Sequence, residues 1–266
     1  MKLAVITGAS SGMGREFAKA IAKEEPLDEM WLIARRLDRL EALKEELEAD
    51  FPSVVFRPIS LDLSLVDSIK VYEFLLQKAK PDLTVLVNGS GFGKFGKFTD
   101  IPMDDYANMI DLNSKSLVLL TQASLPYMSS GAKIYNIDSL SSFQPVPYIA
   151  VYGATKSFVL SFSRAIGAEL KERNIHVLAV CPGWVNTEFF SRAMKDDTIR
   201  YFNHVFEAED VVKRALKDMK RKKDVSVLGF SIRLQVLATK LLPHKLVMKI
   251  WMNQQKKSKN QDKIKR

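Results

Sequence analysis

One stretch of the chain, YIAVYGATKSFV at residues 148–159, places a phenol and an amine at a spacing that could move protons. Tyr152 and Lys156 are four residues apart, so on a helix their side chains lie on one face. An ammonium about 4 Å from a phenol, at an effective dielectric constant of ~20, favours the phenolate by roughly 4 kcal/mol. Free tyrosine ionises near pH ~10, so such a field could make it a working acid or base. The spacing also arises by chance, and the elements that would position the pair are therefore the next test.

Short apolar runs alternate with longer helical patterns over about the first 230 residues. The apolar runs lack a two-residue alternation, and continuous Val, Ile and Leu are typical of a parallel sheet buried on both faces. The repeated strand-then-helix pattern predicts a Rossmann-type, doubly wound α/β fold of about seven parallel strands with helices on both faces. The predicted strands are KLAVIT, MWLIA, VVFRPIS, LTVLVN, AKIYNI, IHVLAV and VSVLG.

The composition bounds the class of protein. With 266 residues and 47% hydrophobic content, the chain can bury a sizeable core. The single cysteine, Cys181, lies in the apolar run HVLAVCP, so we expect a buried thiol, no internal disulfide and a reducing, cytoplasmic location. Only Lys2 precedes the first apolar run, which leads directly into TGASSGMG, so we expect neither a secretory signal nor a membrane span there. No metal site is predicted.

The net charge of +9 is concentrated in two segments. Residues 213–223 carry a net +6 and residues 253–266 a net +5, which leaves the remainder slightly acidic. Charge runs of this kind are typical of solvated faces and frayed tails, so nucleic-acid binding is not predicted.

The end of the chain is apolar and basic together. After Pro243, Lys245 and Lys249 share one helical face, and the apolar side chains gather opposite them. Either a terminal helix covers the sheet or a cleft, which we favour, or this basic segment makes peripheral contact with an anionic membrane surface. The apolar set is Leu246, Val247, Ile250 and Trp251.

Three glycines follow the first predicted strand directly. Gly8, Gly12 and Gly14 lie in VITGASSGMGREFA, between that strand and a helix. Glycines let the backbone turn sharply and approach a pyrophosphate, and the helix N-terminus adds free N–H groups. The spacing TGxxxGxG resembles the glycine motif of the short-chain dehydrogenase/reductase family. The resemblance extends over residues 3 to about 228, implies a nicotinamide dinucleotide cofactor, and brings in the loop residues Ser10, Ser11 and Met13.

The residues after the second predicted strand indicate which dinucleotide is bound. Ala34 stands where NAD-preferring members of the family carry Asp, and Arg35 and Arg36 follow in WLIARR. Arg15 comes directly after the last loop glycine. A dianionic 2′-phosphate would find guanidinium groups able to make forked, charge-assisted hydrogen bonds. We therefore expect NADP(H).

Further cofactor contacts are implied by the resemblance alone. Asp62 in SLDLS resembles the residue that contacts the adenine, and Thr187 in PGWVNTEF resembles the one that holds the nicotinamide carboxamide. The segment NGSG at 88–91 departs from the family pattern NNAG, which bears on hydrogen bonding between sheet and cofactor. The other residues implied are Leu63, Asn88, Gly89, Ser90, Pro182, Gly183 and Val185, together with Tyr152 and Lys156.

The family pattern also supplies partners for the tyrosine. Ser139 lies thirteen residues before Tyr152, and Asn113 falls in the long helix predicted over residues 104–127. By resemblance, Ser139 would bind the substrate oxygen, Lys156 would bind the nicotinamide ribose, and Asn113 would hold a water that relays protons. Asp138 departs from the family's usual Ser or Ala just before the serine.

These features predict an NADP(H)-dependent oxidoreductase that interconverts a ketone or aldehyde and an alcohol, with Tyr152 as general acid and base. Residues 1–230 would form the dinucleotide-binding and catalytic domain, and residues 231–266 an amphipathic helical extension and basic tail of the same domain. Family members imply a homodimer or homotetramer.

Aromatic residues after Thr187 favour a lipid-like, steroid-like or aromatic substrate, although they could equally pack in the core or at a dimer interface. The rival function is a non-catalytic module that senses NADP(H) or binds a membrane surface. The intact Ser139, Tyr152 and Lys156 argue against it. The candidate substrate contacts are Phe92, Phe189, Phe190 and Met194.

Overall fold

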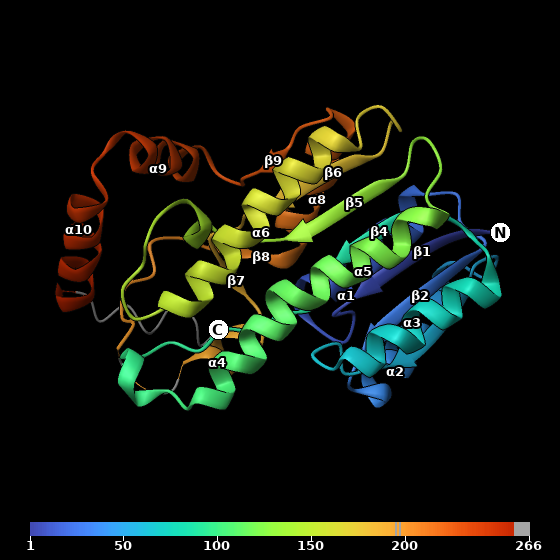
Figure 1. Cartoon of the computed structure of the whole chain (residues 1–266), viewed down its shortest axis with the longest axis horizontal. Coiled ribbons are helices and arrows are strands. Elements are labelled where there is room, and N and C mark those ends of the chain that lie inside the picture. The colour runs from blue at the N-terminus through green and yellow to red at the C-terminus, as the bar shows by residue number, and fades with distance from the viewer. Residues whose placement is uncertain (195, 197, 258–266) are drawn as a thin grey trace.

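A seven-stranded parallel sheet runs through the molecule in the computed structural model, which describes residues 1–194, 196 and 198–257 (Figure 1). The strand order is β3-β2-β1-β4-β5-β6-β9, so the chain winds outward in both directions from β1 and β4. This confirms the predicted Rossmann-type fold. The strands are β1 (Lys2–Thr7), β2 (Glu29–Ala34), β3 (Val55–Ser60), β4 (Asp82–Asn88), β5 (Lys133–Ile137), β6 (His176–Val180) and β9 (Val225–Ser226).

The central strands are buried on both faces, as their continuous apolar runs predict. In β1, Ile6 belongs to one hydrophobic cluster and Val5 belongs to another on the opposite face. Val5 pairs with Trp31 of β2, whose indole is fully buried. Cys181, just beyond β6, is buried and free, as expected.

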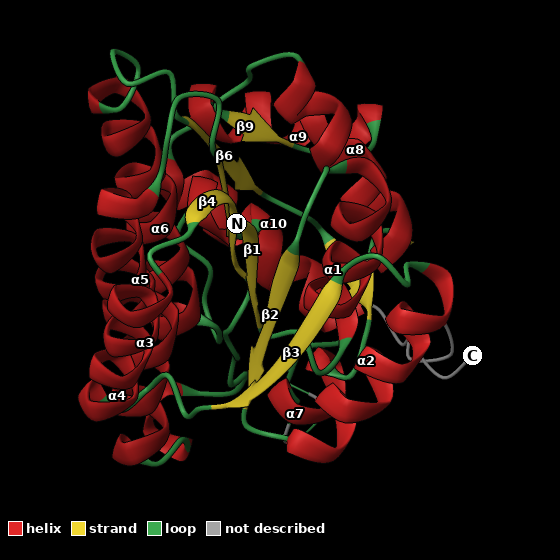
Figure 2. Cartoon of the chain, turned by 90° about the vertical axis from the view of Figure 1, so that its right-hand side faces the viewer, coloured by secondary structure: helices red, strands yellow, loops and turns green. Residues whose placement is uncertain are grey.

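Three helices cover one face of the sheet (Figure 2). They are α1 (Gly12–Glu24), α2 (Leu37–Asp50) and α8 (Ala208–Lys220). Their apolar side chains recur at helical spacing, and Phe17, Leu43 and Val212 are buried in the same cluster. This layer places the start of α1 directly beyond the end of β1.

The other face is covered by α3 (Val66–Ala79), α5 (Ser116–Ser124) and α6 (Ala150–Glu169), with α4 (Met103–Ile110) leading into α5. The sequence predicted one long helix over 104–127. The structure instead shows a π-helical turn at Asp111–Lys115 between α4 and α5, and the regular helix ends at Ser124. Such turns are rare and often lie at functional sites.

The elements beyond β6 form the far wall of a cavity at the carboxyl ends of the strands. They include a two-stranded parallel sheet of β7 (Trp184–Asn186) and β8 (Val205–Glu207), with the short helix α7 (Phe189–Ala193) between them. The sequence did not predict β7 and β8, because three-residue strands are too short to show periodicity.

The chain ends with α9 (Phe230–Leu241) and α10 (His244–Lys257), which lie together at one end of the molecule (Figure 1). Polar contacts fix α10: Trp251 Nε1 donates to the carbonyl of Pro147 at 3.0 Å, and Gln255 Oε1 accepts from the backbone N–H groups of Arg200 at 2.9 Å and Tyr201 at 3.1 Å. Within the described part of the chain, no helix combines the length and apolar composition that a bilayer crossing needs. Residues 253–257 of the predicted basic segment belong to α10, and residues 258–266 lie outside the described part of the chain.

Candidate active site

The loop between β1 and α1 has room only for glycine at its two tightest points. A Cβ on Gly14 would lie 2.2 Å from the carbonyl oxygen of Gly8, and one on Gly8 would lie 2.6 Å from that of Gly89. Gly8 also has a φ of +72°, a backbone angle that residues with a side chain rarely adopt. Ser11 precedes α1 without capping it through its side chain, so no side-chain cap occupies the amides of the first turn. The cradle therefore fits a pyrophosphate at a helix N-terminus.

The departure NGSG has a structural reason. Thr7 Oγ1 accepts hydrogen bonds from the N–H groups of Gly89 at 2.9 Å and Ser90 at 3.2 Å. A Cβ on Gly89 would lie 2.5 Å from the carbonyl oxygen of Thr7, so glycine lets the two strand ends approach. Asn88 points the other way, and its amide donates to Thr121 and Asn136 in the core. Its side chain therefore braces the sheet, and the backbone of the next residues forms the cleft wall.

Of the predicted arginines, Arg36 is the one whose side chain hydrogen-bonds to the phosphate loop. Its Nη2 donates to the hydroxyls of Ser10 at 3.1 Å and Ser11 at 3.0 Å, and its Nη1 donates to Glu188 at 2.9 Å. Arg39 also donates to Glu188. The hydrogen bond from Arg39, which has the largest effect, and the one from Arg36 lower the pKa of the Glu188 carboxyl, although burial raises it. Neither Arg39 nor Glu188 was predicted. The only sequence signal was the position of Arg39 one turn after Arg36.

The other predicted charges lie farther out. Arg15 is paired with Glu46 of α2. Arg35 is 63% exposed, and its Nη1 lies 3.7 Å from Asp62 Oδ2. The pKa of Asp62 is lowered because hydrogen bonds from Ser64 and the charge of Arg35 outweigh burial. Leu63 is buried in the core.

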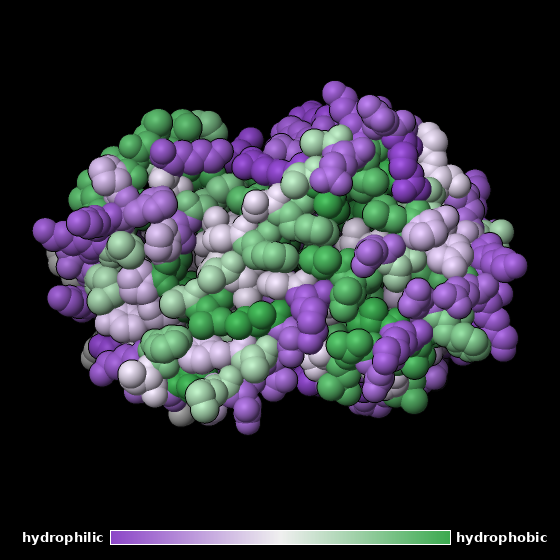
Figure 3. Space-filling view, viewed as in Figure 1, coloured by the Kyte–Doolittle hydropathy of each residue, from purple (hydrophilic) through white to green (hydrophobic). Residues whose placement is uncertain are grey.

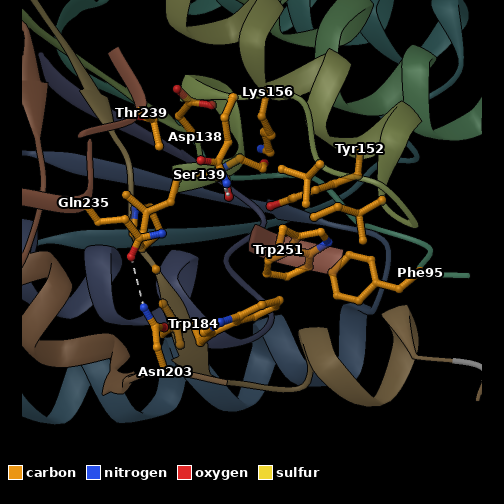
Figure 4. A pocket seen from close by; sticks show the side chains of 18 of the residues that line it. Phe95, Asp138, Ser139, Tyr152, Lys156, Trp184, Asn203, Gln235, Thr239 and Trp251 are labelled. Atoms are coloured by element: carbon orange, nitrogen blue, oxygen red, sulfur yellow. Dashed lines mark hydrogen bonds between the residues drawn. The ribbon is translucent and has the colours of Figure 1, made fainter. Parts of the chain in front are cut away.

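Ser139, Tyr152 and Lys156 converge on one cavity, as Figure 4 shows. Ser139 follows β5, and the other two lie one turn apart on α6. Lys156 Nζ donates to the carbonyl of Ile137 at 2.7 Å and lies 5.7 Å from the centroid of the Tyr152 ring. Gly93 leaves room for that ring, because a Cβ there would come within 3.1 Å of it. The three residue types can donate, accept and stabilise a proton at one place.

Asn113 lies in the π-helical turn, where it fixes the surroundings of the tyrosine. Its Nδ2 donates to the carbonyl of Phe92 at 2.9 Å and to Thr155 Oγ1 at 3.1 Å, and its Oδ1 accepts from the N–H of Phe92. Thr155 in turn donates to the carbonyl of Tyr152 at 2.8 Å. The amide therefore ties the loop after β4 to α6, and the water-holding role expected of Asn113 stays a prediction.

Burial controls the ionisation of the polar groups. It raises the pKa of Tyr152 above its usual range, Asp138 acts in the same direction, and a hydrogen bond with Ser139 opposes them. Burial lowers the pKa of Lys156, while the charge of Asp138 opposes that shift. Within this protein alone, the tyrosine is thus held neutral, and Lys156 does not by itself make it acidic.

Asp138 is the least expected member of the site. It is 1% exposed, accepts a hydrogen bond from Cys181 Sγ at 3.3 Å, and its Oδ1 has no hydrogen-bond partner among the described residues. Burial raises the pKa of its carboxyl to about 7, against the attraction of Lys156. A carboxyl that titrates near neutrality therefore lies directly behind the serine.

The cavity has a volume of about 420 Å³. Phe189 and Phe190 line it as predicted, whereas Phe92 and Met194 pack against the surrounding aromatic cluster without being part of its lining. Met13, Pro182, Gly183, Val185 and Thr187, all predicted cofactor contacts, line the cavity end beside the phosphate loop. Lining residues that the sequence did not single out include Gln144, Trp184, Asn203, Gln235 and Gln254. No cluster suited to a metal ion occurs among the described residues.

Comparisons with known proteins agree with this geometry. Residues 2–198 match the family described as short chain dehydrogenase. The chain is 31% identical over 234 residues to the NADP-dependent 3-hydroxy acid dehydrogenase of Schizosaccharomyces pombe, covering 85% of this chain and 90% of that protein. The chain therefore belongs to the short-chain dehydrogenase family.

Two solved structures show how far the likeness extends. A short-chain dehydrogenase from Sphingobium yanoikuyae in complex with NADPH is 29% identical, with a TM-score of 0.78 and coverage of 94% of this chain and 96% of that one. The bulky-bulky ketone specific alcohol dehydrogenase from Comamonas testosteroni is 25% identical, with a TM-score of 0.74 and coverage of 94% of both chains. The protein is thus an oxidoreductase of the short-chain dehydrogenase type with a nicotinamide cofactor.

Proposed function

We propose that this protein is an NADP(H)-dependent reductase of bulky, apolar ketones or aldehydes and the corresponding alcohol dehydrogenase in the reverse direction. The observation that carries the proposal is the convergence of Ser139, Tyr152 and Lys156 on one cavity that continues to the glycine loop. A module that only sensed a nucleotide would not need these three groups together.

The residues present fit NADP(H). The pyrophosphate would lie against the glycine cradle and the first amides of α1, and Thr187 and Lys156 border the nicotinamide end of the cavity. Glu188 accepts hydrogen bonds from both Arg36 and Arg39, and the 2′-phosphate would compete with it for these guanidinium groups. The Schizosaccharomyces pombe relative is named as NADP-dependent and the Sphingobium structure holds NADPH, which supports this preference.

When bound, the dinucleotide would supply the hydride in its reduced form and a positive charge in its oxidised form. Tyr152, held neutral by burial, donates its proton to the carbonyl oxygen of the substrate in reduction and takes it back in oxidation. The hydroxyl of Ser139 donates to the same oxygen and stabilises the charge that develops there. Lys156, anchored to the carbonyl of Ile137, lies where its charge favours the phenolate once the proton has left.

The walls of the cavity set the kind of substrate. Phe95, Trp184, Phe189 and Trp251 present aromatic rings to it, and the volume suits a ligand of moderate size. Such a surface gains most from a substrate that carries apolar groups on both sides of the carbonyl.

An absorbance assay tests the proposal. Purified protein is mixed with NADPH or NADH and a panel that runs from acetone to aryl and alicyclic ketones of increasing bulk. We expect NADPH consumption with the bulky ketones, little with acetone, and a clear preference for NADPH over NADH. Absence of turnover across the panel, with NADPH shown to bind by fluorescence, would contradict an oxidoreductase acting on such ketones.

A further inference from the structure

One face of α9 is apolar and exposed along its whole length. Figure 3 shows hydrophobic residues gathered over this helix at the upper left of the view, bordered by hydrophilic ones. The exposed side chains recur at spacings of four, three and four residues, which places them on one side of a helix. They are Phe230 (71% exposed), Leu234 (51%), Leu237 (53%) and Leu241 (76%).

The opposite face of α9 packs against the rest of the protein. Ile232 and Thr239 are buried against the rest of the protein, so α9 already has its packing partner. The exposed apolar stripe of Phe230, Leu234, Leu237 and Leu241 therefore does not contribute to the packing of the fold. Four large apolar side chains on one exposed face are unusual for a surface helix in water, and such patches mark interaction sites.

The positive charge around the stripe indicates which kind of partner it binds. Residues 229–257 contain no Asp or Glu, whereas exposed basic side chains flank the stripe and continue on α10. A second copy of this chain placed face to face would bring like charges together. An anionic lipid surface can bury the apolar side chains of the stripe among its acyl chains while its headgroups bind the flanking cations. The basic residues are Arg233 and Lys240 on α9, and Lys245, Lys249 and Lys256 on α10.

The cavity opens beside the stripe. Leu242 and Ile250 line the cavity and are also 38% and 44% exposed, so they belong to its mouth. Gln235 and Ala238, on the flank of α9 next to the stripe, line it as well. We propose that the exposed face of α9 and α10 docks on an anionic lipid surface, which places the cavity mouth against the bilayer. On the function proposed above, an apolar substrate dissolved in the lipid would then enter directly. Docking itself does not depend on that function.

Vesicle sedimentation of the full chain tests the charge requirement. We expect binding to vesicles of phosphatidylglycerol and phosphatidylcholine, weaker binding to phosphatidylcholine alone, and loss of binding as salt rises. The double variant Arg233→Gln/Lys240→Gln should bind roughly 30-fold more weakly, since each surface cation contributes about fivefold. Lys70→Gln/Lys213→Gln, which removes two exposed cations from other helices, should bind as the wild type does.

A second pair of variants tests the apolar stripe. Leu237→Ser/Leu241→Ser should bind at least about tenfold more weakly. Val71→Ser/Phe74→Ser, which alters two exposed apolar residues on α3, should leave binding unchanged. Thermal unfolding by circular dichroism checks that each variant is folded.

Fluorescence tests the orientation. Leu237→Trp should gain emission that is quenched by vesicles with brominated acyl chains, and Phe74→Trp should not. The proposal is overturned if the wild type fails to bind anionic vesicles. It is also overturned if Arg233→Gln/Lys240→Gln and Leu237→Ser/Leu241→Ser both bind these vesicles as tightly as the wild type does. It is equally overturned if light scattering shows that Leu237→Ser/Leu241→Ser splits an oligomer while vesicle binding persists, because the stripe would then be a contact between copies.

Discussion

The wall of the cavity that carries Ser139, Tyr152 and Lys156 is polar and joined by hydrogen bonds, whereas the wall from β7, α7 and α10 is largely aromatic and combines ring packing with hydrogen bonds such as that from Trp251 to the carbonyl of Pro147. On the first wall, Thr155 donates to the carbonyl of Tyr152, and Lys156 donates to that of Ile137. On the second, rings stack on one another, as Trp251 and Trp184 do at a centroid distance of 6.4 Å.

The difference has a consequence for how each wall tolerates change. Hydrogen bonds fix direction as well as distance, so a substitution on the polar wall disturbs the reaction geometry. Apolar packing is adaptable, so a substitution on the facing wall changes mainly which substrate binds and how tightly. The following variants test this contrast, beginning with the largest expected effect.

Asp138→Asn tests whether the polar wall contains a buried charge. The pKa of Asp138 is about 7 in the folded protein and 3.8 in a free side chain. The unfolded chain therefore loses this proton first, and stability falls as pH rises from about 4 to about 7, with no further change above. The wild type should lose roughly 4 kcal/mol over this range that Asp138→Asn does not lose.

Urea unfolding at pH 4.5, 6 and 8 measures this difference, and subtracting one protein from the other removes the contribution of all other groups. Parallel pH dependences in the two proteins would mean that Asp138 is ionised throughout. In the assay for alcohol oxidation, the same variant should also shift the acid limb of the rate profile to lower pH, because the negative charge that raises the pKa of Tyr152 is gone.

Gly14→Ala extends the test to the phosphate loop. The added Cβ would lie 2.2 Å from the carbonyl oxygen of Gly8, so the loop must shift. Loss of two or more charge-assisted hydrogen bonds should weaken NADPH binding by roughly a hundredfold. Gly167→Ala on α6 is the matched control, since its Cβ would make an ordinary 3.4 Å contact with Val177. Calorimetry that gave both variants the affinity of the wild type would argue against the loop as the pyrophosphate site.

Arg36→Ala sharpens the choice between the two cofactors. We expect kcat/KM with NADPH to fall about 10- to 100-fold and kcat/KM with NADH to fall much less, because the 2′-phosphate loses its guanidinium, whereas both cofactors share the loop that Arg36 contacts through Ser10 and Ser11. Arg35→Ala should have the smaller effect, since its side chain is mostly exposed and beside Asp62. A larger fall in kcat/KM with NADPH for Arg35→Ala than for Arg36→Ala would show that Arg35 binds the 2′-phosphate.

Trp251→Ala is the test of the apolar wall. Removing the ring should raise KM for a bulky ketone about tenfold and leave kcat within about threefold, because binding is lost but the reacting groups stay in place. Phe98→Ala removes an exposed ring that stacks on Tyr106 outside the cavity and should change neither constant. A large fall in kcat for Trp251→Ala would contradict the contrast between the walls.

The polar wall was also the part that the sequence predicted well. The glycine cradle, Ser139, Tyr152 and Lys156 have fixed spacings because the backbone around them has few alternatives. The seven strands of the main sheet were predicted from continuous apolar runs, whereas their order in the sheet comes from the structure. The π-helical turn at Asn113 could not be predicted, because it depends on hydrogen bonds to Phe92 in a distant loop.

The apolar wall was predicted only in part. The favoured interpretation of the C-terminal segment, a helix that covers a cleft, agrees with Val247, Ile250 and Trp251 in the cavity lining, whereas Gln235 enters through the placement of α9, which no local pattern specifies. Phe92 and Met194 looked equivalent to Phe189 in sequence, yet they pack behind the lining. Glu188 was missed because its role comes from Arg36 and Arg39, which are about 150 positions away in the chain.

The most direct test of the central claim is the turnover of Tyr152→Phe at saturating NADPH. The phenol is replaced by a ring that fills the same space between Phe95 and Phe189, so the cavity keeps its shape. The account predicts unchanged NADPH affinity, and ketone reduction slowed by about 10²- to 10⁴-fold. Reduction at a rate close to that of the wild type, with the cofactor bound, would show that the proton comes from another group.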